Sequence, residues 1–404
     1  MEKSRTIDRV RPCQCERDHF VVVFTRGIVE NMRRKEKIRK VVKATRMVFR
    51  DCLLMNGCLV AAPAQVSYYP KNAKSYMYSW PGRDLGFSLV AMLLLGEDHF
   101  EPALTWIWDR SEDFQKSNID WMEGLLFRSY HVNGKMREHN FQPDQTGTLL
   151  WAIGERMKAS SSEKQRELFE CVARKAAWGL HKIWDGDHFN PEIEDLWEER
   201  IPPGHKTNLT YSLAACCVGM RWAGEHFGDD EWKKIADQMR SQILESACSE
   251  EHPYILRQCG GDSPLDTTVD ASLAGLVWPF DCGIERALLA QTTDAIVKNL
   301  VSSHGVHRYP DDKYKGAPEG DHEHINDQAG AWPLLTYWLA IAYRRLGKKK
   351  EAEKHFWLAT DLVEDDGLIS EQFFCCERVP WVGVKPLLWS HAMFVFAARE
   401  LGFL

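Results

Sequence analysis

Residues 142–157 read QPDQTGTLLWAIGERM, and after a short polar link residues 163–184 read EKQRELFECVARKAAWGLHKIW. In the first stretch, apolar residues recur at the spacing that places them on one face of an α-helix: Leu149, Leu150, Ile153 and Met157. Two such helices joined by a short link form a helical hairpin. This pattern decides the fold, because it repeats along the chain.

Helical periodicity continues from about residue 36 to the end of the sequence. It predicts twelve helices, at residues 36–53, 84–96, 99–115, 143–158, 163–184, 207–227, 229–248, 268–280, 284–302, 328–347, 349–362 and 386–401. Short connections alternate with long ones rich in Trp, Gly, Pro and charge. Alternation typical of strands is scarce, and the apolar pieces at 20–24 and 58–67 are expected to form a hairpin at most.

Six helical hairpins closed in a ring predict an all-α fold, the (α/α)6 barrel. The ring would gather the long connections on one face around a central pit, at residues 54–83, 116–142, 185–206, 303–327 and 363–385. Connections of this length inside a compact domain are usually functional. We expect an N-terminal extension at 1–30 and one catalytic domain at 31–404.

The composition excludes several classes of protein. The net charge of −7 is spread over mixed acidic and basic residues, so no basic face for nucleic acid is expected. The opening 20 residues lack the apolar core of a signal peptide, and the longest apolar run, 89–95, cannot span a bilayer. The 12 cysteines include no C-x-x-C pair, which favours reduced, structural thiols and no zinc site. We expect a cytoplasmic protein without nucleic-acid or membrane partners, and the sequence sets no oligomeric state.

The chain has 16 tryptophans, and many stand beside charged residues. Sugars have apolar C–H faces and polar rims, so their sites combine aromatic platforms with charged hydrogen-bonding groups. Large helical proteins also bury tryptophan in their cores. We expect at least five of six candidates to line a cavity: Trp80, Trp121, Trp197, Trp332, Trp381 and Trp389.

Two loop segments carry a guanidinium beside aromatic residues. In residues 76–87, YMYSWPGRDLGF, Tyr78 and Trp80 precede Arg83 and Asp84 where a helix begins. An adjacent Arg and Asp can bind neighbouring hydroxyls, because the first donates and the second accepts. An Asp at a helix N-terminus is also favoured by the helix dipole alone. Residues 307–312, HRYPDD, supply Arg308 ahead of Trp332.

Two further segments carry the candidate catalytic carboxylates. Residues 194–199, EDLWEE, place Glu198 and Glu199 directly after Trp197. Residues 367–373, GLISEQF, place Glu371 between apolar neighbours. Inverting glycoside hydrolysis needs a carboxylic acid beside the leaving oxygen, and a carboxylate about 6.5–9.5 Å away that activates water. Acidic loops of either kind are also common on protein surfaces.

In this order the motifs resemble glycoside hydrolase family 15, the glucoamylase-like family. The resemblance covers residues 50–401 and rests on Tyr78-x-Trp80-x-x-Arg83-Asp84, Gln142-Pro-Asp144-Gln145-x-Gly147, Asp195-Leu-Trp197-Glu198-Glu199, Arg308-Tyr-Pro-x-Asp312, Gly367-Leu-Ile-x-Glu371-Gln372 and Trp389-Ser390-His391. It implies an (α/α)6 barrel that inverts the anomeric carbon without a metal or cofactor.

The resemblance also assigns roles to residues. It implies Glu198 as general acid and Glu371 as general base. The residues expected to bind the substrate are Tyr78, Trp80, Arg83, Asp84, Trp197, Glu199, Arg308, Trp332 and Trp389. Arg83, Asp84 and Arg308 would hold the non-reducing glucose, and Trp197 and Glu199 would contact that glucose or the next residue.

The substrate stays open at this point. Ser370 stands where the family usually has Pro before the base, and the loops differ from those of starch-degrading relatives. A short α-glucoside is expected, with isomaltose ahead of maltose and trehalose. The alternatives are a trehalase on the same fold and a carbohydrate-binding protein without chemistry. A prenyl-transferring toroid needs an extended Asp motif, which the pairs at 311–312 and 365–366 do not provide.

Overall fold

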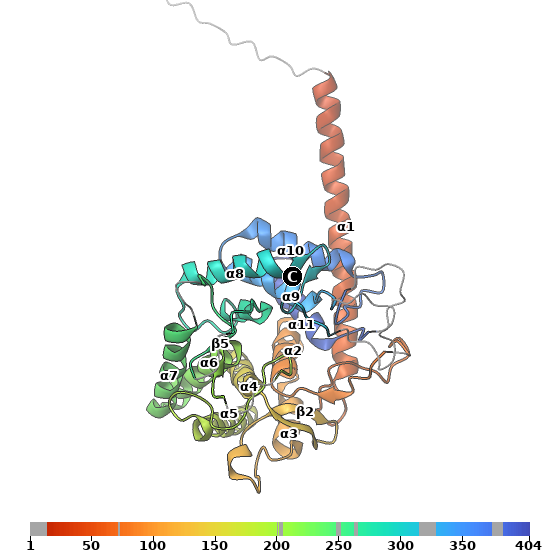
Figure 1. The fold of residues 1–404 in the computed structure, drawn as a ribbon. Helices are drawn as coiled ribbons and strands as arrows, with labels where there is room; N and C mark the ends of the chain where they lie inside the picture. The colour runs from red at the N-terminus through yellow and green to blue at the C-terminus, as the bar shows by residue number, and fades with distance from the viewer. Residues whose placement is uncertain are drawn as a thin grey trace, which may run out of the picture.

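The computed structural model describes residues 14–404 except 72, 200, 202–204, 248–251, 262–265, 315–328 and 374–382, and for residues 14–29 it describes the course of a helix alone. Within these residues the chain forms eleven α-helices and two 3-10 helices. The helices alternate along the chain between an outer and an inner layer (Figure 1).

The inner layer is a closed ring. Its members are α2 (Arg83–Leu94), α4 (Pro143–Met157), α6 (Thr210–Phe227), η2 (Ala271–Leu276), α9 (Pro333–Arg345) and α11 (Leu388–Glu400). Each packs against the next, and α11 packs back against α2. The outer layer consists of α1 (Gln14–Cys52), α3 (Phe100–Arg110), α5 (Glu163–Ile183), α7 (Asp230–Ser246), α8 (Arg286–Leu300) and α10 (Lys349–Leu362). This arrangement confirms the predicted (α/α)6 barrel.

The two layers differ in how much of each helix is buried. Every residue of α11 from Leu388 to Ala398 is buried, because an inner helix packs against ring neighbours and outer helices at once. The outer α5 buries one stripe, which includes Phe169, Val172 and Ala176. A capping box at Ser162 and Gln165 starts α5 and ends the link of the hairpin.

Two local predictions are wrong. The helix expected at 268–280 is only the short 3-10 helix η2, because Pro279 has no backbone N–H to donate and disfavours helical geometry at Trp278. The hairpin expected from 20–24 and 58–67 does not form, since 20–24 lies inside α1. Helix α1 runs without a break across residue 30, and Figure 1 shows its N-terminal part extending well beyond the barrel.

Small β-sheets lie in the long connections. β1 (Tyr78–Ser79), β2 (Phe127–His131) and β3 (Met136–Phe141) form a three-stranded antiparallel sheet. β4 (Asn208–Leu209) pairs with β5 (Gln258–Cys259), and β6 (Val301–Ser302) pairs with β7 (Gly305–Val306). In the part of the chain described here, no helix is long and apolar enough to cross a membrane.

An aromatic layer fills the middle of the barrel. Phe87 of α2 stacks on Trp389 of α11 at 5.7 Å between ring centroids, and meets Trp338 edge-on at 5.6 Å. Trp151 and Phe280 pack on the same ring at 5.1 and 6.1 Å. Phe87, Trp338 and Phe280 are fully buried. This layer therefore separates the two ends of the ring.

Candidate active site

The inner helices begin at the end of the barrel where the long connections lie. Arg83 and Asp84 stand in the first turn of α2, and Trp332 immediately precedes α9. Trp389 lies in the first turn of α11. Helix N-termini carry partial positive charge. The structure thus brings these predicted residues to one end of the barrel, with the loops that carry the candidate acid and base.

Arg83 lies at the centre of a buried cluster. Its guanidinium contacts Asp84 at 3.2 Å and Asp144 at 3.3 Å, and lies 5.1 Å from the centroid of the Trp389 ring beneath it. Gln145 Oε1 accepts from the backbone N–H of Arg83 at 2.9 Å, which fixes the start of α2. Burial raises the pKa of Asp84 to about 6, although Arg83 opposes the shift. Asp144 was part of a quoted motif but was not predicted as a site residue.

Asp195 shapes the turn that presents the candidate acid. Its Oδ1 accepts from the backbone N–H of Trp197 at 2.8 Å and of Glu199 at 2.9 Å. Glu198 between them has φ +72°, a left-handed conformation that is uncommon outside glycine. Its side chain is 39% exposed and lies 3.6 Å from Arg128 of β2. The turn thus directs the Glu198 carboxylate outward from the buried Asp195.

A partly buried cation, Arg257, anchors this turn from a distant segment. Arg257 pairs with Asp195, with Glu199 at 2.6 Å and with Asp270 at 3.3 Å. Asp270 in turn accepts from the indole N–H of Trp197 at 3.0 Å. Burial raises the pKa of Asp195 to about 6, against the opposing charge of Arg257. Arg257 and Asp270 were not predicted, because neither belongs to a local motif.

Arg308 is held within an aromatic cage. Asp312 accepts two hydrogen bonds from its guanidinium, at 2.6 and 2.7 Å. Four rings surround the guanidinium carbon, each with its centroid 4.9–5.4 Å away: Trp197, Tyr309, Tyr314 and Trp332. Tyr309 also donates its hydroxyl to Glu199. The cage thus brings the predicted residues Arg308, Trp332 and Glu199 close together.

Glu371 is almost fully enclosed, with 3% of its surface exposed. The hydroxyl of Tyr314 donates to its Oε1 at 3.4 Å and is itself bonded to the hydroxyl of Tyr76. Burial raises the pKa of Glu371 to about 7, the hydrogen bond from Tyr76 opposes this, and the negative charge of Glu198 adds to it. The negative charge of Glu198 therefore acts on Glu371. Neither tyrosine was predicted, although Tyr76 lies inside a quoted segment.

Several buried polar atoms around these residues have no partner among the described residues. They are the indole N–H groups of Trp80, Trp332 and Trp389, and Oε2 of Glu371. Buried polar groups in folded proteins are normally paired, so a set left unpaired in one region indicates a site for a polar ligand. Three indole donors and one carboxylate acceptor match a molecule that both accepts and donates hydrogen bonds.

Of the remaining predicted tryptophans, one lies in this cluster, one lies outside it and one is not described by the structure. Tyr78 and Trp80 pack edge to face at 5.9 Å, and Arg137 of β3 covers the Tyr78 ring at 4.2 Å. Trp121 instead packs against Phe127 and Phe141 beside the small sheet, so it is not part of this cluster. Trp381 lies outside the described residues. In the described part of the chain, no group of three or more His, Cys, Asp or Glu side chains is placed to hold a metal ion.

The pH dependence of activity is expected to report the environment of Glu371. A carboxylate that acts as a base must be ionised, so kcat/KM should fall as the pH drops through about 7. Tyr76→Phe removes a hydrogen bond that favours the ionised form, and should move this acid limb upward by about one pH unit. The measurement is kcat/KM between pH 4 and 9.

Tyr68→Phe is the matched control, because the Tyr68 hydroxyl donates to Asp51 at 2.8 Å, outside this cluster. It should leave the acid limb in place. If Asp84 set the limb instead, the midpoint would lie near 6 and Tyr76→Phe would not move it. That result would contradict the assignment of the limb to Glu371.

An (α/α)6 barrel whose inner helices begin at a cluster of tryptophan, guanidinium and carboxylate groups is typical of one class of glycoside hydrolases. The chain belongs to that class as a member of glycosyl hydrolases family 15, whose model matches residues 54–399.

The chain is similar in sequence to several known proteins. It is 28% identical over 400 residues to an uncharacterized glycosyl hydrolase of Methanocaldococcus jannaschii, covering 95% of this chain and 59% of that protein. The chain therefore spans less than two thirds of that relative. It is 26% identical to the isomaltose glucohydrolase of Kribbella flavida, covering 70% of this chain and 71% of the relative. It is also 26% identical to trehalase 2 of Sulfolobus acidocaldarius, covering 70% and 46% of the two chains.

Solved structures support the fold. A glycosidase variant in complex with glucose superposes with a TM-score of 0.70 at 21% identity, covering 92% of this chain and 99% of that chain. A bacterial glucoamylase complexed with acarbose gives a TM-score of 0.59 at 19% identity, covering 80% and 49%.

Proposed function

We propose that the chain is an inverting, exo-acting α-glucosidase that releases β-glucose from short α-glucosides. One observation carries the proposal. Glu371 is a buried carboxylate with one unpaired oxygen beside two tyrosine hydroxyls, and it senses the charge of Glu198 on a separate loop. Inverting hydrolysis needs two carboxyl groups at one glycosidic bond, and Glu198 and Glu371 would supply them from two separate loops.

In the proposed mechanism the Arg83 cluster and Arg308 hold the hydroxyls of the terminal glucose. Glu198, which lies on the exposed turn, protonates the glycosidic oxygen as the bond to the leaving group breaks. Glu371 takes a proton from a water that attacks the opposite face of the anomeric carbon. Tyr76 and Tyr314 would help to orient that water and to keep Glu371 ionised. Positive charge that develops on the sugar ring is stabilised by the surrounding carboxylates.

The closed interior of the barrel supports exo action. The floor beneath Arg83 is Trp389, and Trp389 stacks on the fully buried Phe87. A glucan chain cannot thread through this layer. We infer that only a chain end reaches the reacting position, so that glucose units are released one at a time.

Isomaltose is the first proposed substrate. The likeness to an isomaltose glucohydrolase extends over 70% of this chain and 71% of that protein. A trehalase is the second candidate, because trehalase 2 of S. acidocaldarius is equally similar over a comparable part of this chain. Both enzymes would use the same carboxylates and differ in the subsite beyond the cleaved bond.

The test follows the anomeric protons by NMR from the first minute after mixing with isomaltose, and then with maltose and trehalose. Early β-glucose is expected, and the substrate with the largest kcat/KM identifies the linkage. Early α-glucose would mean retention and would contradict the role of Glu371 as a base for water. Glucose binding without turnover of any α-glucoside would support a carbohydrate-binding protein instead.

A further inference from the structure

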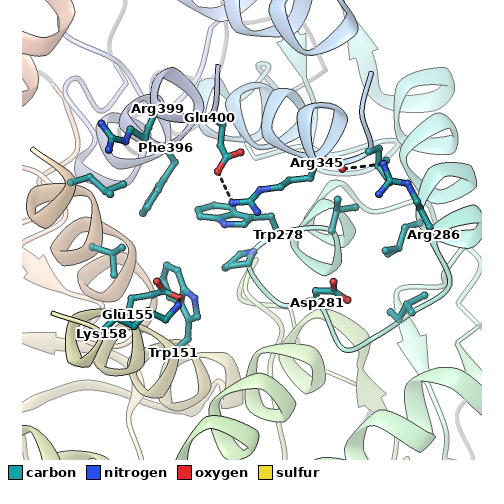
Figure 2. A pocket seen from close by; sticks show the side chains of 17 residues that line it. Trp151, Glu155, Lys158, Trp278, Asp281, Arg286, Arg345, Phe396, Arg399 and Glu400 are labelled. Atoms are coloured by element: carbon teal, nitrogen blue, oxygen red, sulfur yellow. Dashed lines mark hydrogen bonds and ion pairs between the residues drawn. The ribbon is translucent and has the colours of Figure 1, made fainter. Parts of the chain in front are cut away.

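A pocket lies at the opposite end of the barrel from the candidate active site. It has a volume of about 550 Å³ and is formed where α2, α4, α9 and α11 end and α8 begins (Figure 2). Volumes of about 300–1,000 Å³ are usual for small-molecule sites. The aromatic layer around Phe87 separates this pocket from Arg83 and the other residues at the first end.

The pocket has an aromatic floor. Trp278 packs against Phe396 with ring centroids 4.7 Å apart and meets Trp151 edge-on at 6.0 Å. Trp151 and Phe396 are buried, whereas Trp278 keeps part of its surface exposed. Figure 2 shows its indole among the charged side chains that surround the pocket. Such a ring offers an apolar platform to a ligand that enters the pocket.

Charges of both signs surround this floor. Arg345 pairs with Glu400, and Lys158 pairs with Glu155 at 2.7 Å. Asp281 also lines the pocket. Arg286 and Arg399 line the pocket as well. The lining therefore has four basic and three acidic side chains. A nearly neutral ring of donors and acceptors disfavours a strongly charged ligand of either sign.

Two acidic residues at this end of the barrel lie where helix dipoles disfavour them. Basic side chains at helix C-termini are expected from the helix dipole, which accounts for Lys158, Arg345 and Arg399. Carboxylates in the same position are not, because they face the negative end of the dipole. Yet Glu155 lies in the last turn of α4 and Glu400 is the last residue of α11. Capping therefore does not explain why acceptors and donors are presented together over an aromatic floor.

We propose that this pocket is a second, non-catalytic site that binds a neutral sugar of one or two glucose units. The sugar ring packs on Trp278, its hydroxyls donate to Glu400 and Asp281, and Arg345 donates to its oxygens. The choice of an α-glucoside among neutral polyols rests on the proposed function. The ligand is either the substrate or the released glucose.

The test is isothermal titration of the full chain carrying Glu371→Gln, with isomaltose and separately with glucose. Two binding sites per chain are expected for at least one of the two sugars, which shows whether substrate or product is bound. Adding Arg308→Ala should weaken the site at the first end and leave the second. Adding Asp281→Ala and Arg345→Ala instead should raise the Kd of the second site at least tenfold.

Exposed charges on α10 provide the control: Lys350→Ala and Asp361→Ala should leave both sites unchanged. In an otherwise unaltered chain, Asp281→Ala with Arg345→Ala should keep kcat on isomaltose within twofold. A single site that Arg308→Ala abolishes would overturn the inference. Tighter binding of glucose 6-phosphate than of glucose, lost with Arg345→Ala, would overturn it in favour of an anion site. Because binding is measured without turnover, these outcomes stand even if the proposed hydrolysis fails.

Discussion

Replacing Glu371 with Gln is expected to lower kcat/KM for isomaltose by about 10²–10⁴-fold, the usual contribution of a general base. The amide has nearly the same shape as the carboxyl group but cannot take a proton from water. Glu371 is buried and contacts Tyr314, so an isosteric substitution keeps the surroundings filled. The measurement is the initial rate of glucose release, with the unfolding temperature recorded alongside.

Glu364→Gln is the control for this variant. Glu364 lies in the same connection, 363–385, where it is exposed and pairs with Lys385. Its substitution should change kcat/KM less than twofold. Activity of Glu371→Gln within tenfold of the unaltered chain, with an unchanged unfolding temperature, would exclude Glu371 as the base.

The second large effect is expected for Glu198→Gln, again about 10²–10⁴-fold on isomaltose. Its distinguishing feature is the dependence on the leaving group. A general acid matters only where the departing oxygen needs a proton, so α-glucosyl fluoride should restore most of the lost rate. The same substrate should not restore Glu371→Gln, because water must still be activated. The comparison of the two substrates in both variants separates the two roles.

Glu192→Gln tests the loop without touching the proposed acid, since Glu192 is an exposed residue of the same connection. It should behave as the unaltered chain on both substrates. An equal loss for Glu198→Gln on isomaltose and on the fluoride would contradict its role as acid, and would indicate that the side chain acts in binding.

Much of the fold could be predicted because the inner helices are mostly apolar over long stretches, as in 333–343 and 388–398, where every residue is buried. The β2–β3 hairpin was missed, although Asn133-Gly134 is a strong hairpin signal and Gly134 has φ +91°. The segment 268–280 has the composition of an inner helix. Its shortening to η2 follows from Pro279, a local helix-ending signal that the apolar pattern outweighed in the prediction.

The candidate site was predictable where chemistry is concentrated in short motifs, such as Arg83-Asp84 and Glu198-Glu199. The residues that hold these motifs in place were not. Arg257 lies 62 residues from Asp195, and Tyr76 lies 238 residues from Tyr314. Such partners are common residue types in unremarkable surroundings, and only the closed ring brings them together. Local motifs therefore indicate the proposed reacting groups more readily than the residues that hold them in place.

The closure of the ring by α11 has a consequence for the order in which the chain is synthesised. His391 of α11 bonds through Nδ1 to Thr45 at 2.8 Å, 346 residues earlier, and through Nε2 to the backbone N–H of Ile369. The same helix places Trp389 beneath Arg83. A ribosome therefore releases α2 and α4 long before their last partner exists, with apolar faces still uncovered. Nascent chains that end before α11 should therefore depend on chaperones. They should show no partial activity, because they lack Trp389, which lies beneath Arg83.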